Sequence, residues 1–460
     1  MAQAPAGASG AATPQWSSRF AFLMAAIGSA VGLGNLWRFP FQTGENGGSA
    51  FVFVYLLCVI FVAYPILMGE LAVGRHKGLS AVGSTIGLAR DAGKSSGWGV
   101  VGAVQVFAGF LILPTYSVIA GQVMAYSLMA FLGEFSGREA TDAATVAPLY
   151  DGTLMALFWQ TLFMAVTIFI VAQGVHKGIE RVVTILMPLF FVMLAGLSVY
   201  ALMTGAAADA IAYLFAPRFS EITPGVVLAA LGQAFFSIGV GGAIMITYGA
   251  YLSRNENIAS NAGVIAGADT LVAIVAGLMI FPIVFAHGLD PAAGSGLIFG
   301  ALPAVFAGMP GGFVIGGAFF FLAFIAALTS SISLVLVASA VGEEQFKWGR
   351  ARSAVICGAA AWALGALAIF ATATGPWFDF IAGSVALPLG ALLLAIFAGW
   401  IVPRATMRHE LANASDGMFR FWRFFIRYLA PIAVFLILLL GLDAKFDFGL
   451  NDFIAGMAGG

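Results

Sequence analysis

Long apolar runs separated by short polar segments fill most of this chain. Eleven of them lie at about residues 18–42, 49–74, 98–131, 153–172, 179–203, 224–253, 260–287, 312–341, 352–371, 378–402 and 418–441. A membrane-spanning helix needs about 20 predominantly apolar residues, and each run is at least near that length. The pattern therefore predicts an all-α polytopic membrane protein with eleven transmembrane helices.

Composition supports a membrane protein and argues against other classes. Hydrophobic residues make up 61% of the 460 residues and charged residues only 9%, whereas soluble domains are about 25% charged. The net charge of -1 leaves no basic face for nucleic acid. Cys58 and Cys357 both lie inside apolar runs, which argues against a disulfide framework or a metal cluster. The four histidines lie in different loops, so no cluster predicts an enzyme.

The distribution of Lys and Arg predicts the orientation in the membrane. With the N-terminus inside, the cytoplasmic segments carry sixteen of these residues and the external segments three, while Arg38 lies within the first run. This asymmetry follows the positive-inside rule. We expect a disordered cytoplasmic tail at 1–15, one transmembrane domain at 16–441 and an external C-terminal tail at 442–460.

Two of the runs are interrupted by glycines at mid-membrane depth. The first contains Gly28-Ser29-Ala30-Val31-Gly32-Leu33-Gly34-Asn35, and the sixth contains Ser237-Ile238-Gly239-Val240-Gly241-Gly242. Close packing through small residues would explain one such run. Two corresponding interruptions, five spans apart, instead favour inverted five-helix repeats with discontinuous helices 1 and 6 around a midplane site. The repeats would cover about 18–203 and 224–402, with 418–441 as a peripheral helix.

Four ionisable residues lie in or at the ends of apolar runs: Arg38, Glu70, Asp269 and Asp379. An unpaired charge is costly at that depth. The four residues therefore form either a buried structural ion pair or part of a functional site or gate.

These features resemble the neurotransmitter:sodium symporter family, whose motifs match in order over about residues 16–440. The matching segments are Ala30-Val31-Gly32-Leu33-Gly34-Asn35, Arg38-Phe39-Pro40, Glu45-Asn46-Gly47-Gly48, Gly69-Glu70-Leu71-Ala72-Val73-Gly74-Arg75, Lys177-Gly178-Ile179-Glu180-Arg181, Gln233-Ala234-Phe235-Phe236-Ser237, Leu328-Thr329-Ser330-Ser331 and Asp379-Phe380-Ile381-Ala382-Gly383. Eleven spans and an Ala- and Gly-rich composition are similar to bacterial amino-acid transporters of the family. The resemblance thus implies a multi-pass protein of the bacterial cytoplasmic (inner) membrane.

The resemblance implies two sodium sites that use carbonyls of the interrupted first run. Site 1 would use Ala30, Asn35, Ser237, Asp269 and the carboxylate of the substrate, which couples ion and substrate binding. Site 2 would use Gly28, Val31, Ala326, Thr329 and Ser330. Thr329 could instead bond a carbonyl of its own helix, as Ser and Thr in membrane helices often do.

The resemblance also implies an amino-acid site. The exposed amides of Leu33 and Gly34 and the hydroxyl of Tyr116 would bind the substrate carboxylate. Amine-transporting relatives have an Asp at the position of Gly32, so we expect an α-amino acid and not a monoamine. The implied substrate-binding residues are Ala30, Leu33, Gly34, Ile112, Tyr116, Phe236, Ser237, Gly239, Gly242, Ser330 and Leu334.

The side-chain part of that site contains no ionised residue, so the substrate should be neutral. Gly239 and Gly242 stand where the bacterial leucine transporter has a serine and a phenylalanine. The enlarged wall favours a bulky apolar or aromatic side chain, unless another residue of the protein fills the space.

The gates are implied in the same way. Arg38 and Asp379 resemble the outer gate, above a lid of Tyr116 and Phe236. The inner gate would contain Trp16, Tyr251 and Glu344. The usual N-terminal arginine of that gate is replaced by Thr13, with Arg19 as a possible substitute.

Together these features predict a sodium-coupled symporter that imports a neutral amino acid by alternating access. Ala273 stands where chloride-dependent relatives have a Ser, and Asp269 could supply the negative charge that chloride supplies elsewhere. We therefore expect no chloride requirement. The expected partners are a small amino acid and the lipid bilayer, with no nucleic acid, and the protein would be a monomer or a weak homodimer. The alternative is a sodium-dependent amino-acid sensor or a channel-like homologue without concentrative transport.

Overall fold

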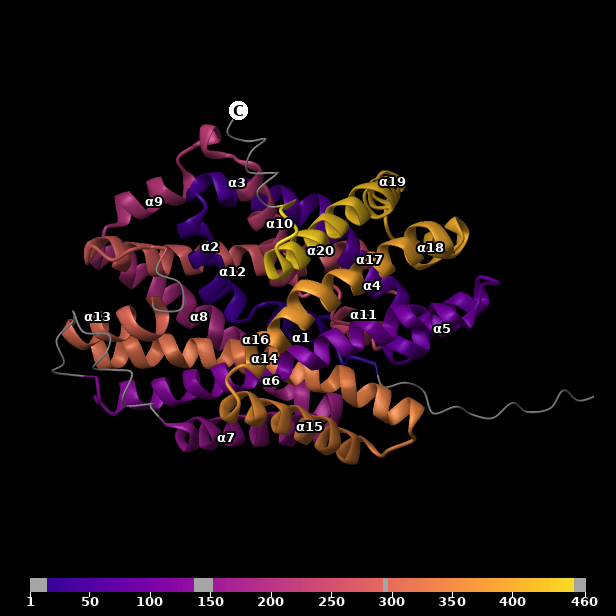
Figure 1. Ribbon diagram of the computed structural model, residues 1–460. Helices are drawn as coiled ribbons and strands as arrows, with labels where there is room; N and C mark the ends of the chain where they lie inside the picture. The colour runs from indigo at the N-terminus through magenta and orange to yellow at the C-terminus, as the bar shows by residue number, and fades with distance from the viewer. Residues whose placement is uncertain (1–14, 136–151, 293–296, 451–460) are drawn as a thin grey trace, which may run out of the picture.

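The computed structural model describes residues 15–135, 152–292 and 297–450, and this part of the chain is helical without strands (Figure 1). Short π- and 3-10-helical segments are labelled η. The first half contains α1 (Arg19–Ala30), η1 (Gly34–Arg38), α2 (Phe39–Glu45), α3 (Ser49–Cys58), η2 (Val59–Ala63), α4 (Tyr64–Lys77), α5 (Ala81–Asp91), η3 (Ser96–Gly99), α6 (Val100–Phe131), α7 (Thr153–Ala172), η6 (Val175–Glu180), α8 (Arg181–Thr204) and α9 (Ala207–Phe215).

The second half repeats the pattern of long apolar helices and ends in two of them. It contains η7 (Phe219–Glu221), α10 (Pro224–Ile238), α11 (Ile244–Ala250), α12 (Ile258–Ala286), η8 (Leu297–Ala301), α13 (Leu302–Gly308), α14 (Gly312–Gln345), α15 (Arg350–Phe370), α16 (Thr374–Asp379), η9 (Phe380–Ala386), α17 (Leu387–Ile396), η10 (Phe397–Ile401), α18 (Arg404–Glu410), α19 (Asp416–Phe424), η11 (Phe425–Leu429) and α20 (Ala430–Phe446).

The spans agree with most of the apolar runs. Among the described residues, nine continuous helical segments are long and apolar enough to cross a membrane, and α1 with Gly34–Glu45, bent by 50°, can make a tenth. The sixth run folds as α10 and α11, and neither helix is long enough alone. The all-α polytopic prediction is confirmed, whereas the count of eleven spans stays a prediction. Helix α20 continues to Phe446, into the predicted tail 442–460, and residues 1–14 and 451–460 lie outside the described part.

Both interruptions predicted from glycine occur. Helix α1 ends at Ala30 because Val31 has an extended backbone, and helical structure resumes at Gly34. The second break has left-handed backbone at Gly239, Gly241 and Ala243, with φ of 70°, 88° and 62°. At Gly241 a Cβ would also lie 2.3 Å from the Leu387 carbonyl oxygen, so only glycine fits there.

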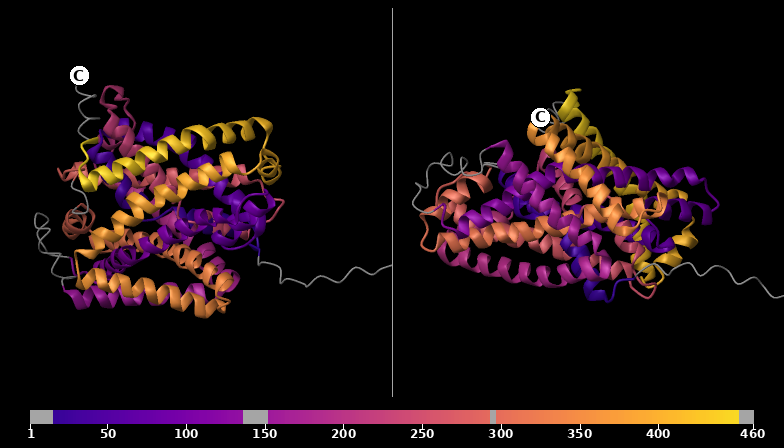
Figure 2. Two further views of the ribbon diagram at one scale, coloured as in Figure 1. Left: turned by 45° about the vertical axis from the view of Figure 1, so that its right-hand side comes forward. Right: turned by 90° about the horizontal axis from the view of Figure 1, so that it is seen from below.

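The first break lies next to a buried central helix, α14, whose Ser330 bonds the Ser29 and Val31 carbonyls. In α14, 89% of the most apolar window is buried, against 28% in Val175–Thr204, Arg350–Phe370 and Asp416–Phe446, so α14 is central and the other three are peripheral. Figure 2 shows α7 and α15 on the side of the bundle opposite α20. Helices α5, α18 and α19 lie at one end of the bundle, while α9 and α13 lie at the other (Figure 1).

Candidate functional site

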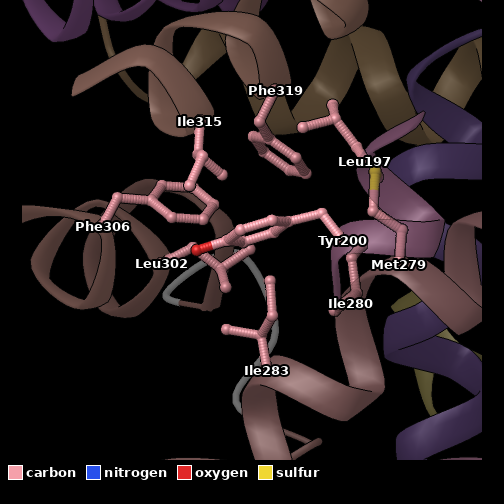
Figure 3. Close-up of a pocket in the computed structure, with 9 residues that line it drawn as sticks. All are labelled: Leu197, Tyr200, Met279, Ile280, Ile283, Leu302, Phe306, Ile315 and Phe319. Carbon is pink, nitrogen blue, oxygen red and sulfur yellow. The ribbon is translucent and has the colours of Figure 1, made fainter. Parts of the chain in front are cut away.

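Two cavities between helices are candidates for a ligand site. The first, of about 830 Å³, contains a charged residue of each sign, Arg38 and Asp379, and is large enough for an amino acid. The second has room for about one water, and Figure 3 shows the ring of Tyr200 among apolar side chains there. The larger cavity is therefore the candidate site. Its walls include Leu33, Gly34, Trp37, Arg38, Ile112, Thr115, Tyr116, Phe236, Asp379, Gly383 and Leu387.

The residues predicted for sodium site 1 converge where α1 breaks. The Asn35 amide nitrogen donates to the Ser237 hydroxyl at 3.0 Å and to an Asp269 carboxylate oxygen at 2.8 Å. The Ser237 hydroxyl donates to the other Asp269 oxygen at 2.7 Å. All three side chains are buried, and Ala30 is buried at the end of α1. The side-chain oxygen atoms from η1, α10 and α12 converge here and include one carboxylate, and oxygen atoms are the ligands that a hard cation prefers.

The residues predicted for sodium site 2 lie between α1 and α14. The Ser330 hydroxyl donates to the Ser29 carbonyl at 3.2 Å and to the Val31 carbonyl at 3.4 Å. Thr329 donates to the carbonyls of its own helix, Ile325 at 3.1 Å and Ala326 at 3.2 Å. This is the alternative bonding expected for such a residue.

Gly28 completes this second group by close packing. A Cβ there would lie 3.3 Å from the Thr329 Cβ and 2.8 Å from the Met187 sulfur. All five predicted residues are therefore neighbours. The covering side chain, Met187 of α8, was not identified from the sequence because nothing distinguishes it from other apolar positions.

Tyr116 points its hydroxyl at the first break. A Cβ at Gly32 would lie 3.2 Å from that hydroxyl and 3.0 Å from the Ser330 Oγ. The Tyr116 hydroxyl is buried, and the Ser330 hydroxyl and the Leu33 backbone lie within bonding reach of it, although neither makes a hydrogen bond of good geometry. A weakly bonded buried hydroxyl is costly, so a polar ligand group can bind it. The same distances leave little space for any side chain at position 32.

Phe236, which was predicted as part of the lid, lies between Gly34 and Arg38 on the wall of the larger cavity. A Cβ at Gly34 would lie 3.1 Å from its ring, and the Arg38 guanidinium lies 4.3 Å from the ring centroid on a cation–π contact. Gln233 donates to the Gly34 carbonyl at 3.2 Å. Gln233 was part of a motif but had no predicted role.

Arg38 and Asp379, which were predicted as the outer gate, do not contact each other as an ion pair. Arg38 and Asp379 line the same cavity, but no ion pair joins them in the described structure. Asp379 instead accepts a hydrogen bond from the Thr115 hydroxyl at 2.5 Å, while Arg38 stacks on Phe236. Thr115 was missed, because its position next to Tyr116 gives no signal of its partner.

The predicted side-chain pocket contains one residue that the sequence analysis did not include. A Cβ at Gly242 would lie 3.4 Å from Leu387 Cδ2 and 3.9 Å from the Gly109 Cα, whereas one at Gly239 would meet only Ile244 at 4.0 Å. Ile112 and Leu387 line the larger cavity, and Leu334 lies next to Gly109. Leu387 therefore fills part of the space opposite Gly242.

The carboxylate of Glu70 binds the backbone at the second break. Its Oε1 accepts from the Gly241 N–H at 2.8 Å, and the Gln105 side chain lies within bonding reach of the same carboxylate. Of the two sequence interpretations, a buried ion pair does not describe Glu70, which binds backbone at the interruption.

The opposite end of the bundle is sealed by aromatic packing. The Trp16 ring nitrogen donates to the Tyr248 carbonyl at 3.2 Å, and its backbone N–H donates to the Tyr251 carbonyl at 3.1 Å. The Trp16 and Tyr248 rings pack edge to face at 5.2 Å.

The two charged residues considered for the inner gate have other partners. Glu344 accepts the Ser80 N–H at 2.6 Å, before α5. Arg19 donates to Asn261 at 2.8 Å and forms an ion pair with Glu256 at 3.5 Å. Thr13 lies outside the described residues.

Comparisons with known proteins agree with this architecture. The model of the sodium:neurotransmitter symporter family matches residues 13–145 and 151–455. An uncharacterized sodium-dependent transporter, YhdH of Bacillus subtilis (strain 168), is 35% identical over 92% of this chain and 97% of its own length. A second uncharacterized sodium-dependent transporter, from Haemophilus influenzae, is 31% identical over 93% of this chain and 98% of its own length. The crystal structure of MhsT in complex with L-phenylalanine matches with a TM-score of 0.83 and 41% identity, over 93% of this chain and 99% of that one.

The matched family consists of membrane transporters and is not a class of enzymes. Its model covers most of the chain, and the relatives match along nearly their whole length. The family predicted from the sequence motifs is therefore confirmed. This chain belongs to the sodium:neurotransmitter symporter family.

Proposed function

We propose that the protein imports a neutral, bulky apolar or aromatic L-amino acid together with sodium, by alternating access and without chloride. The observation that carries this proposal is the convergence of Asn35, Ser237 and Asp269 at the break of α1, next to the large cavity. A substrate carboxylate bound there can complete the coordination of a cation that Asp269 attracts. Binding of the two is then reciprocally coupled.

The groups around the first break favour an α-amino acid. The buried Tyr116 hydroxyl is only weakly bonded to its neighbours Ser330 and Leu33, and Leu33 and Gly34 line the cavity next to it. A carboxylate can accept from all three. The narrow space beside Gly32 supports a substrate that brings its own carboxylate.

The side-chain region favours a neutral, apolar substrate. Ile112, Leu334, Leu387 and the two glycines Gly239 and Gly242 are all apolar. The near-open space at Gly239 supports a bulky side chain, although Leu387 occupies part of the volume opposite Gly242. The phenylalanine in the MhsT crystal structure is consistent with this class.

Chloride independence is supported by the surroundings of Asp269. Ala273, one helical turn later on α12, is fully buried and offers no polar group to an anion. A chloride next to the buried Asp269 carboxylate would bring two negative charges together. Like charges at such a separation repel strongly when buried.

Alternating access is supported by the difference between the two ends of the bundle. Arg38 and Asp379 line the larger cavity without pairing with each other, while Trp16 packs against Tyr248 and Tyr251 elsewhere in the bundle. Transport would require the first pair to close and the Trp16 contacts to separate.

Sodium-driven uptake of neutral amino acids into proteoliposomes is the direct test of this function. We expect concentrative, saturable uptake with an inward sodium gradient. In Asp269→Asn, which removes the charged ligand, the apparent affinity for sodium should fall about tenfold or more. Asp209→Asn, an exposed acid on α9, is the matched control. Amino-acid binding without flux would support the sensor alternative, and flux without concentration would support a channel.

Thiol labelling tests the orientation and the open cavity. A Cβ at Gly383 on the cavity wall and one at Gly349 before α15 both meet open space, so cysteines there should react with thiol reagents. In a background with Cys357→Ser, an impermeant maleimide should label Gly383→Cys in right-side-out vesicles and Gly349→Cys in inverted ones. Sodium plus substrate should slow labelling at 383. The reverse sidedness would overturn the predicted orientation.

Replacing chloride by gluconate should leave the initial rate of sodium-driven uptake unchanged. The reason is the fixed negative charge of Asp269 beside the apolar Ala273. The measurement compares initial rates at constant sodium and membrane potential. A several-fold decrease in the rate would show that this charge does not replace chloride.

Size selectivity should depend on position 242. Gly242→Phe is expected to shift preference from aromatic amino acids to smaller ones, with Gly242→Ala intermediate, because the new side chain projects toward Leu387. Competition for uptake by a series from glycine to tryptophan measures the ranking. Gly267→Ala, where a Cβ meets nothing, is the control. An unchanged ranking, or a wild type that prefers glycine, would place the pocket elsewhere.

A further inference from the structure

We propose that a basic pocket between α18 and α19 binds the phosphate group of an anionic phospholipid. The pocket has a volume of about 360 Å³ and lies beside the start of the span Asp416–Phe446, at the end of the bundle that carries α5 (Figure 1). This site is independent of the amino-acid site. Its lining residues are Arg404, Arg408, Asp416, Phe419 and Arg420.

A buried aromatic ring fixes the floor of this basic pocket. Phe419 is only 2% exposed, and the guanidinium carbons of Arg404 and Arg408 lie 5.8 Å and 5.3 Å from its ring centroid. Two cation–π contacts on one ring hold the two guanidinium groups near each other. The pocket is therefore formed by the fold and does not depend on mobile side chains alone.

Most of the positive charge around the pocket is not neutralised. Arg408 is the exception, because it bonds the Leu411 and Ala414 carbonyls and pairs with Asp416 at 2.7 Å. Arg404 and Arg420 have no hydrogen bond or ion pair within the described part of the chain.

The neighbouring acid that could neutralise them has other partners. Glu410 accepts from His76 at 2.9 Å and from Arg254 at 2.8 Å, and it contacts Arg75. Burial raises the pKa of Glu410, but the hydrogen bond from His76 and the charges of Arg254 and Arg75 outweigh this and lower it below the usual value. Glu410 therefore remains ionised within a different cluster and leaves the pocket basic.

Two further arginines lie just inside the span and lack partners for part of their donors. Arg423 Nη1 and Arg427 Nε are shielded from water and have no hydrogen-bond partner among the described residues. Arg423 is within electrostatic reach of Arg404 and Arg427. Unmet charged donors at this depth favour a bound anion, and a phosphate can accept from several guanidinium groups at once.

The surroundings favour a lipid over free phosphate as the source of the anion. Trp400, Phe424 and Tyr428 are 49%, 57% and 46% exposed around Arg427, as in the aromatic belts at the level of lipid headgroups. Ile432, 61% exposed, continues an apolar surface along the span, where acyl chains can lie. Basic pockets beside transmembrane helices bind acidic headgroups in this way.

Native mass spectrometry of the full-length protein in detergent tests the proposal. We expect retention of phosphatidylglycerol over phosphatidylcholine, and about tenfold or greater loss of this preference in the double variant Arg404→Gln/Arg420→Gln. Arg90→Gln, an exposed arginine on α5, should keep the preference. If the double variant does not fold, the single variant Arg420→Gln, at an exposed residue, should reduce the preference for phosphatidylglycerol by a smaller factor.

The arms of the experiment separate the possible outcomes. Inorganic phosphate at millimolar concentration should displace phosphatidylglycerol weakly, because it lacks the acyl contacts. If inorganic phosphate displaces phosphatidylglycerol completely at millimolar concentration, the pocket binds a soluble anion and the lipid assignment is overturned. A double variant that folds, shown by an unchanged melting temperature, and still prefers phosphatidylglycerol would overturn the proposal as a whole.

Discussion

The structure depends on how the backbone is satisfied where two helices break at membrane depth, since the hydrocarbon offers no partner for the exposed groups. Asn35 accepts the Gly32 N–H with its side-chain oxygen at 3.0 Å, and Glu70 accepts the Gly241 N–H. Gln233 donates to the Gly34 carbonyl. Each of these hydrogen bonds to the backbone comes from a polar side chain that would otherwise be costly at this depth. The polar residues and the glycine interruptions therefore explain each other.

The Asn35 side chain, which bonds the backbone at the first break, also connects three helical segments. Asn35 bonds the broken backbone with its oxygen and bonds Ser237 and Asp269 with its nitrogen. A cation bound by the Asp269 carboxylate competes with the Asn35 amide for the same oxygen atoms. If sodium binds there, as we propose, ion binding and the relative positions of η1, α10 and α12 are thermodynamically linked, and the linkage acts in both directions.

The sequence predicted the helical fold and the positions of both breaks, because glycine clusters and apolar run lengths are local properties. It also predicted which residues gather around the first break, through the family motifs. It did not predict that Thr115 binds Asp379, that Glu344 binds the start of α5 or that Leu387 lies against Gly242. Those contacts depend on helix rotation, which periodicity cannot give when helices such as α14 are apolar on nearly every side.

In the proposed transport cycle, Arg38 and Asp379 must come together when the cavity closes. To pair with Asp379, Arg38 must leave the Phe236 ring, and Asp379 must leave Thr115. A cation–π contact contributes about 0.5–2 kcal/mol and a hydrogen bond to a charged group about 1.5–3 kcal/mol. Desolvation offsets much of the attraction in a partly buried ion pair, so the net gain from pairing is small. If this pair is the outer gate, as we propose, a substrate that contacts Phe236 and Tyr116 better in the closed state needs only a few kcal/mol of differential binding to shift the population.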